Sequence, residues 1–241
     1  MKFSEFLTEK TSHRTSLTKD EIVKIFKENC SNAHPDYPFW RGMRGNEDGI
    51  ILEGQARSRR SINNSNHYTI AMDHFIKKRG NDLPLRSACT IAGSNNMLNQ
   101  VHNFGPDIYA IFPFDGVKIG VSQEMDLWGY RFPINGHLLT LNKLNGLYQD
   151  ANITDSDYFS FVRELKQYIE ENKDDSSDKL VEIFGDDVDG TLKQIYDTEM
   201  EFNFVDSKEM EHISSKEVWI GGKCLAIAKD VYKEILKDLF Y

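Results

Sequence analysis

A glutamate stands at the start of a strongly apolar segment near the end of the chain, in the run Glu217-Val-Trp-Ile220. Side chains alternate along a strand, so Glu217 and Trp219 point to one face and the two aliphatic residues to the other. Gly221-Gly222 has the composition of a two-residue turn, and the apolar run 224–228 follows it, which together predict a β-hairpin. A carboxylate at the mouth of a buried strand is either solvated or held in a cleft, where it stabilises a developing positive charge.

Two segments further upstream carry polar side chains that suit an anionic ligand. An aromatic segment over 37–44 predicts a strand, and its Trp40-Arg41-Gly42 includes an arginine whose fork of donors suits a phosphate. A second predicted strand over 86–93 runs into Gly93-Ser94-Asn95. The helix predicted after it places three residues on its apolar side: Met97, Val101 and Phe104.

In their order and spacing these three segments resemble the ADP-ribosyltransferase family, in its Arg-Ser-Glu class. That family has a Tyr-Arg-Gly-like first strand, then a Ser-Thr-Ser strand followed by a small residue and an aromatic. A Glu-x-Glu or Gln-x-Glu then precedes an apolar strand. The likeness extends over residues 37–228. The polar composition and compact size are also similar to those of ADP-ribosyltransferase-like proteins of large bacteriophages.

The resemblance implies that NAD is the donor substrate, that no metal takes part, and that a host protein or a nucleic acid is the acceptor. Glu217 stabilises the oxocarbenium-like ribose formed when the bond to nicotinamide breaks, and Ser94 supports it by hydrogen bonding. Arg41 anchors the phosphate or ribose of the dinucleotide. Gly42 lets backbone groups approach the nicotinamide amide, and Phe104 stacks near its ring.

The chain departs from the family's pattern at two places. Where the family has Ser-Thr-Ser, this chain has Ala92-Gly93-Ser94 or Gly93-Ser94-Asn95, which retains one hydroxyl. Ser215 stands two positions before Glu217, where the family has a Glu or Gln that helps to choose and activate the acceptor. We therefore count Ser215 with Glu217 among the candidate catalytic residues. Three outcomes stay open: transfer to an acceptor other than arginine, hydrolysis of NAD, or loss of activity.

Other classes of protein also stay open. One is a non-catalytic binding protein on the same scaffold, such as a virion component or an inhibitor of a host system. Another is a nucleic-acid processing protein that uses the basic stretch Arg57–Arg60. Arg44 is a rival to Arg41 as the anchor of an anion.

Charge is unevenly distributed along the chain. The net charge is −9, while residues 155–211 hold 18 acids and 6 bases, a balance of −12 that leaves +3 for the rest. This asymmetry permits an anionic ligand on the N-terminal half and argues against a general nucleic-acid binder.

Targeting signals and cysteines indicate the compartment. No apolar run is long enough to cross a membrane, and the N-terminal residues lack the apolar core of a secretion signal. The three cysteines show no metal-like spacing, which suggests reduced thiols inside a cell. We therefore expect a cytoplasmic protein, in the host cytoplasm if it is phage-encoded, with no membrane partner.

The pattern of elements predicts an α+β fold: an ADP-ribosyltransferase-like split pair of mostly antiparallel sheets with flanking helices. Residues 1–241 are expected to form a single domain, with a helical acidic insert at 137–205. Thr18 and Glu21 predict a capping box at the start of a helix. A second hairpin is expected between 108–113 and 117–121, across Asp115-Gly116. Further helices are expected at 65–79, 138–147, 155–171, 178–200 and 230–240.

Overall fold

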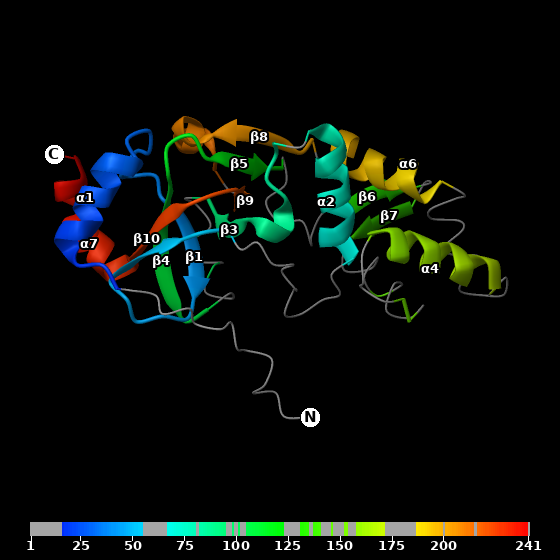
Figure 1. The fold of residues 1–241 in the computed structure, drawn as a ribbon, viewed down its shortest axis with the longest axis horizontal. Coiled ribbons are helices and arrows are strands. Elements are labelled where there is room, and N and C mark those ends of the chain that lie inside the picture. Colours follow the sequence, from blue (N-terminus) through cyan, green and yellow to red (C-terminus); the bar gives the residue numbers. More distant parts are fainter. Residues whose placement is uncertain are drawn as a thin grey trace, which may run out of the picture. The chain divides into compact units, whose positions relative to one another are not determined.

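An eight-stranded sheet dominates the computed structural model of the chain, in the order β2-β10-β4-β1-β3-β9-β5-β8 (Figure 1). Its strands are β1 (Phe39–Met43), β2 (Gly49–Leu52), β3 (Thr90–Gly93), β4 (Asp107–Pro113), β5 (Lys118–Val121), β8 (Asn203–Asp206), β9 (Glu217–Ile220) and β10 (Cys224–Ala228). The structure describes residues 16–54, 67–80, 82–94, 98, 101, 105–122, 131–134, 137–140, 146, 152–153, 158–171, 187–199, 201–214 and 216–240.

The predicted α+β class with antiparallel pairing is confirmed. Strand pairs β2–β10, β10–β4, β4–β1, β1–β3 and β3–β9 are all antiparallel. The strands expected to form two sheets lie in one sheet. Its halves, β2-β10-β4-β1 and β3-β9-β5-β8, meet where Trp40 pairs with Gly93. β1 pairs with β4 over five residues but with β3 at this one.

The two predicted hairpins are wrong, because their strands exchange partners. β4 pairs with β10, and β9 lies between β3 and β5, so neither turn joins neighbouring strands. The two connections run side by side instead: the Phe114 N–H donates to the Lys223 carbonyl, and the Gly221 N–H donates to the Lys118 carbonyl. Gly116 has a positive φ of 76°, which suits a turn. The turn connects β4 to β5, but these two strands pair with other strands.

Two helices cover one face of β4 and β10. They are α1 (Lys19–Asn29) and α7 (Lys229–Phe240), which also contact each other. The predicted capping box at Thr18 and Glu21 is confirmed, and so is the C-terminal helix. Rings of Phe26, Phe112, Trp40 and Tyr232 form the contact with the sheet: the centroids lie 5.0 Å apart for Phe26–Phe112 and 5.6 Å apart for Trp40–Tyr232.

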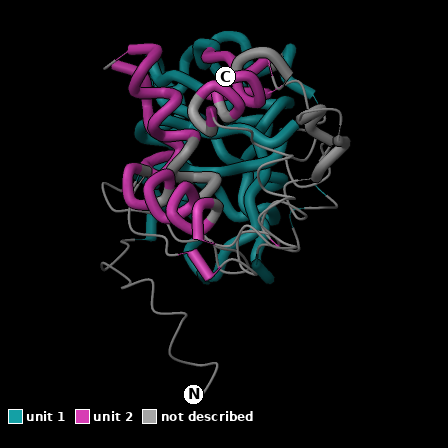
Figure 2. The backbone as a smooth tube through the Cα atoms, turned by 90° about the vertical axis from the view of Figure 1, so that its right-hand side faces the viewer, with its two compact units in different colours: residues 1–54, 90–119, 205–241 teal, residues 55–89, 120–204 magenta. Residues whose placement is uncertain are grey.

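The chain divides into two compact units, coloured separately in Figure 2. Unit 1 comprises residues 1–54, 90–119 and 205–241, and unit 2 comprises residues 55–89 and 120–204. The segment 137–204 of the predicted insert lies in unit 2. Its described elements are α2 (His67–Arg79), η1 (Arg86–Ala88), β6 (Arg131–Ile134), β7 (His137–Thr140), α4 (Tyr158–Glu171), α6 (Val188–Lys193) and the π-helical turn η4 (Gln194–Glu199).

Three local predictions in unit 2 are corrected. Residues 137–140 form strand β7, paired with β6, where a helix was expected, and the intervening Asn-Gly sequence is typical of a tight hairpin. Residues 86–88 form a 3-10 turn before β3, because the Ser87 N–H donates to the Asp73 carboxylate 3.1 Å away. The helical spacing of Phe159 with Val162 and Leu165 predicts that its side chain faces inward on α4, but this side chain is 76% exposed.

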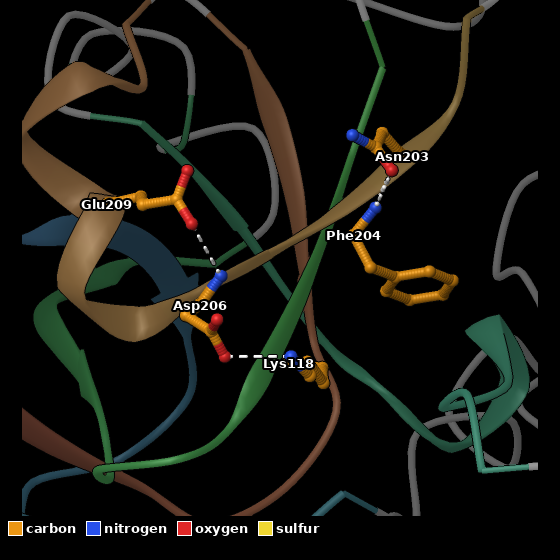
Figure 3. A network of polar contacts seen from close by, with 5 residues as sticks. All are labelled: Lys118, Asn203, Phe204, Asp206 and Glu209. Carbon is orange, nitrogen blue, oxygen red and sulfur yellow. Dashed lines mark hydrogen bonds and ion pairs between the residues drawn. The ribbon is translucent and has the colours of Figure 1, made fainter.

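Strands β5 and β8 are joined by polar contacts near the end of the sheet (Figure 3). Lys118 Nζ lies 2.8 Å from Asp206 Oδ1. The same aspartate caps the turn η5 (Ser207–His212), where Glu209 accepts a hydrogen bond from the Asp206 N–H. These partners are partly exposed, so they fix the course of the chain more than they stabilise it.

Candidate functional site where three strands meet

The three segments singled out from the sequence lie on neighbouring strands. β3 is bordered by β1 on one side and by β9 on the other. Trp40 pairs with Gly93, and Gly93 pairs with Glu217, so these residues form one row across three strands. We call Trp40, Gly93 and Glu217 the central row. Segments that are far apart along the chain therefore meet in unit 1.

Ser94 holds the chain directly before Glu217. Its side chain is fully buried, and its hydroxyl accepts a hydrogen bond from the Lys216 N–H at 2.7 Å. The Ser94 N–H donates in turn to the Lys216 carbonyl at 2.8 Å. These two bonds extend the pairing of β3 with β9 by one residue and fix the start of β9.

The register assigns the candidate residues to two faces of these strands. Residues directly opposite in an antiparallel pair share a face, and successive residues alternate. The central row therefore points to one side, which the ring contact of Trp40 with Tyr232 identifies as the α7 face. Arg41 and Ser94 each follow a member of this row, so their side chains leave from the opposite face. The register thus brings these strands together but directs Arg41 and Glu217 to different sides.

Arg41 is half-buried and interacts with the backbone of the neighbouring strand. Its Nη1 donates to the Ile91 carbonyl at 2.5 Å, at the seam where β1 and β3 pair at a single residue. Its positive charge also acts on Cys224. Burial raises the pKa of the Cys224 thiol to about 12, although a hydrogen bond with Thr90 and the charge of Arg41 act in the opposite direction. The thiol is therefore protonated at neutral pH and is no nucleophile.

Glu217 is half-buried on the α7 face, and its carboxylate has a donor on its own strand. Trp219 Nε1 lies 2.5 Å from Glu217 Oε1, and the Trp219 side chain is only 2% exposed. The residue directly opposite the carboxylate, Gly93, has no side chain to offer. The alternation predicted from the sequence places Glu217 and Trp219 on one face, so the signal for this contact was present in the sequence.

Gly42 is required by the backbone of the chain itself. A Cβ at this position would collide with the Val101 carbonyl oxygen and would lie 2.9 and 3.0 Å from the backbone N and O of Gly105. A Cβ on Gly105 would in turn lie 2.5 Å from the Met43 backbone. The glycine was expected to let a ligand approach, and in the structure the backbone of Val101 and Gly105 approaches it.

The remaining candidates are less informative. Arg44, the rival anchor, is exposed just beyond β1. Ser215, Phe104 and the basic stretch Arg57–Arg60 lie outside the described residues. Among the residues that the structure describes, no three His, Cys, Asp or Glu side chains are grouped to hold a metal ion.

Comparisons of the chain with protein-family models, with curated proteins and with solved structures found no match. In the described part of the chain, no helix has the length and apolar character to cross a bilayer.

Proposed function

We propose that this protein is a mono-ADP-ribosyltransferase that uses NAD as its donor substrate. The central row carries the proposal, because it joins the strand of Trp40-Arg41-Gly42, the strand end at Gly93-Ser94 and the strand that begins at Glu217. These are the segments on which the resemblance to the family depends, and sequence spacing does not dictate that they become neighbours. Two four-stranded halves that meet at one residue pair also agree with a split pair of sheets.

The proposed reaction replaces one bond at the ribose C1 atom with another. The bond between C1 and the nicotinamide nitrogen breaks, and nicotinamide leaves with the electron pair. The ribose becomes oxocarbenium-like, and the Glu217 carboxylate offsets its positive charge. A nucleophile of the acceptor then donates an electron pair to C1 and loses its proton to solvent. With water as the nucleophile, the same steps hydrolyse NAD.

Arg41 is the proposed anchor of the dinucleotide. A guanidinium carries five N–H donors in a rigid fork, so the bond from Nη1 to the Ile91 carbonyl does not by itself exclude contact with a phosphate. Ser94 supports the site through the backbone of Lys216, and not by touching the carboxylate. In this proposal Phe104 and Ser215 keep their expected roles beside the nicotinamide and the acceptor.

A macromolecule is the proposed acceptor, and the charge distribution favours a protein over a nucleic acid. The 18 acids and 6 bases of residues 155–211 would repel a phosphate backbone. We therefore expect a host protein to be modified, in the cytoplasm.

A non-catalytic binding protein on the same scaffold is the second candidate. It is favoured by the register, which directs Arg41 away from the face of Glu217, and by the backbone that fills the space in front of Gly42. Such a protein would keep the sheet and bind a partner without consuming NAD.

Nicotinamide release from NAD by the purified protein, alone and with host lysate, tests the two candidates. The enzyme is supported by release that Glu217→Gln abolishes and by transfer of label from NAD to a lysate protein. An Arg41→Lys variant should raise the KM for NAD, because lysine lacks the planar fork. Wild-type protein that neither releases nicotinamide nor labels the lysate would support the binding protein.

A further inference from the structure

A buried indole donates to the proposed catalytic carboxylate. Trp219 Nε1 and Glu217 Oε1 lie 2.5 Å apart, while the tryptophan is 2% exposed and the glutamate half-buried. The two residues are separated by one position on strand β9, so alternation places them on the same face. Their contact is thus built into a single strand and needs no other element to bring the partners together.

On β3, the residue that pairs with Glu217 has no side chain that could donate to the carboxylate. Gly93 stands opposite Glu217 and has only hydrogen there. The Ser94 hydroxyl, which the resemblance assigned to the support of Glu217, instead accepts from the Lys216 N–H. The register sends this hydroxyl to the face away from the carboxylate.

The chemistry of an indole suits this task. Its N–H is a donor only, so it hydrogen-bonds the ionised carboxylate and offers nothing to the acidic hydrogen of the protonated form. A buried indole N–H also requires a partner, which gives the tryptophan one orientation. A hydrogen bond to one oxygen limits the rotation of the carboxylate plane. The position of the second oxygen is then limited as well.

We infer that Trp219 is a positioning residue, which orients the Glu217 carboxylate for its action on the ribose of NAD. This inference rests on the proposed function and deepens it. It assigns to an indole on the same strand the part that the family's serine was expected to play.

The contact can be tested without any enzyme assay, by NMR of the indole N–H groups. The chain has three tryptophans, so labelled protein gives three indole signals. One indole signal of the wild type should move in Glu217→Gln, because the N–H then donates to a neutral amide oxygen in place of a charged carboxylate oxygen. Trp219→Phe should remove this signal, while the other two report that the fold persists. Three signals that keep their wild-type positions in Glu217→Gln would overturn the inference.

The kinetic test uses Trp219→Phe, which keeps an aromatic ring in the core and deletes the N–H. We expect kcat to fall about tenfold to a hundredfold with KM for NAD unchanged, since the donor acts on the charged carboxylate and not on the dinucleotide. Thermal unfolding of the variant separates this loss from unfolding, and the indole signals of Glu217→Gln decide the contact if Trp219→Phe does not fold. Unchanged kcat in a folded variant would overturn the inference about Trp219 but leave the proposed function standing. A wild type that releases no nicotinamide would overturn the proposed function, and the inference with it.

Discussion

The two faces of strands β1, β3 and β9 use their polar groups differently. On the α7 face, the Glu217 carboxylate is half-buried and receives a hydrogen bond from an indole. On the opposite face, Ser94 and Arg41 bond to backbone groups of adjacent strands, and the Cys224 thiol is buried and protonated. The comparison teaches that neighbouring residues of one motif can differ in role: Glu217 has the proposed chemical role, while Ser94 joins strands. A change at Glu217 should therefore alter activity, and a change at Ser94 should alter stability.

The largest effect should come from Glu217→Gln. Without the carboxylate's charge, nicotinamide release should fall about a hundredfold to a thousandfold, as when a group that stabilises a transition state is lost. The free energy of unfolding should change little, because the side chain is half-buried and keeps its shape. Release is measured by chromatography and stability by urea denaturation. Glu53→Gln is the matched control, since Glu53 is an exposed glutamate paired with Lys223. Equal activity of the two variants would remove the distinction between the faces.

Gly42→Ala should destabilise the protein, because other backbone atoms lie against this glycine on the α7 face. The added methyl group has to displace backbone at Val101 and Gly105, so we expect a loss of at least about 3 kcal/mol in the free energy of unfolding. Gly146→Ala is the control, because among the described residues no atom outside its own stretch of chain lies within 4 Å of the added Cβ. A stable Gly42→Ala protein with impaired NAD binding would instead show that a ligand approaches this glycine.

Ser94→Ala tests the role of the opposite face in stability. It leaves the buried Lys216 N–H without its acceptor and should cost about 2 kcal/mol in urea denaturation. Ser207→Ala is a matched control, since Ser207 is 1% exposed and its hydroxyl has no hydrogen-bond partner among the described residues. That variant should be neutral or slightly stabilised. A Ser94→Ala protein as stable as Ser207→Ala would mean that the strand start is held by other contacts.

The smallest effect is an alkaline loss of stability from Cys224. Burial raises its pKa from the ordinary value of 9.0 to about 12, so the unfolded chain loses this proton first as the pH rises. Between these values the free energy of unfolding should fall by about 1.4 kcal/mol per pH unit for this thiol. Burial also raises the pKa values of Cys30 and Tyr232, so part of the loss remains without Cys224.

Urea denaturation of the wild type and of Cys224→Ala at pH 8 and pH 10 measures this difference. The variant should lose less stability than the wild type between the two conditions. Equal losses would show that solvent reaches the thiol in the folded protein.

Local structure was predictable from the sequence, and strand pairing was not. The capping box at Thr18 and helix α7 depend on residues close together in the chain, and both are confirmed. The turns at Asp115-Gly116 and Gly221-Gly222 were recognisable, but their strands pair with partners that are distant in the sequence. The short apolar run Leu138-Leu139 suits a helix or a strand, and pairing with β6 decides the outcome.

The candidate site was predictable in the same partial way. The order of the three segments indicated that Arg41, Ser94 and Glu217 belong together, and their strands are neighbours. Which face each side chain takes depends on the register of strands that are distant in the sequence. A shift of one residue in that register moves every side chain of a strand to the other face. The donor from Trp219 was visible in the alternation of β9, because this contact is local.

The pairing of β9 and β10 with distant strands also affects the order in which the sheet can form during translation. β9 and β10 are interior strands, and each is bordered on both sides by strands from earlier in the chain. Until residues 217–228 leave the ribosome, β2 lacks a neighbour and the edges of β4 and β3 stay unpaired. These edges therefore stay open to aggregation until residues 217–228 have been translated, and the sheet can close only after that.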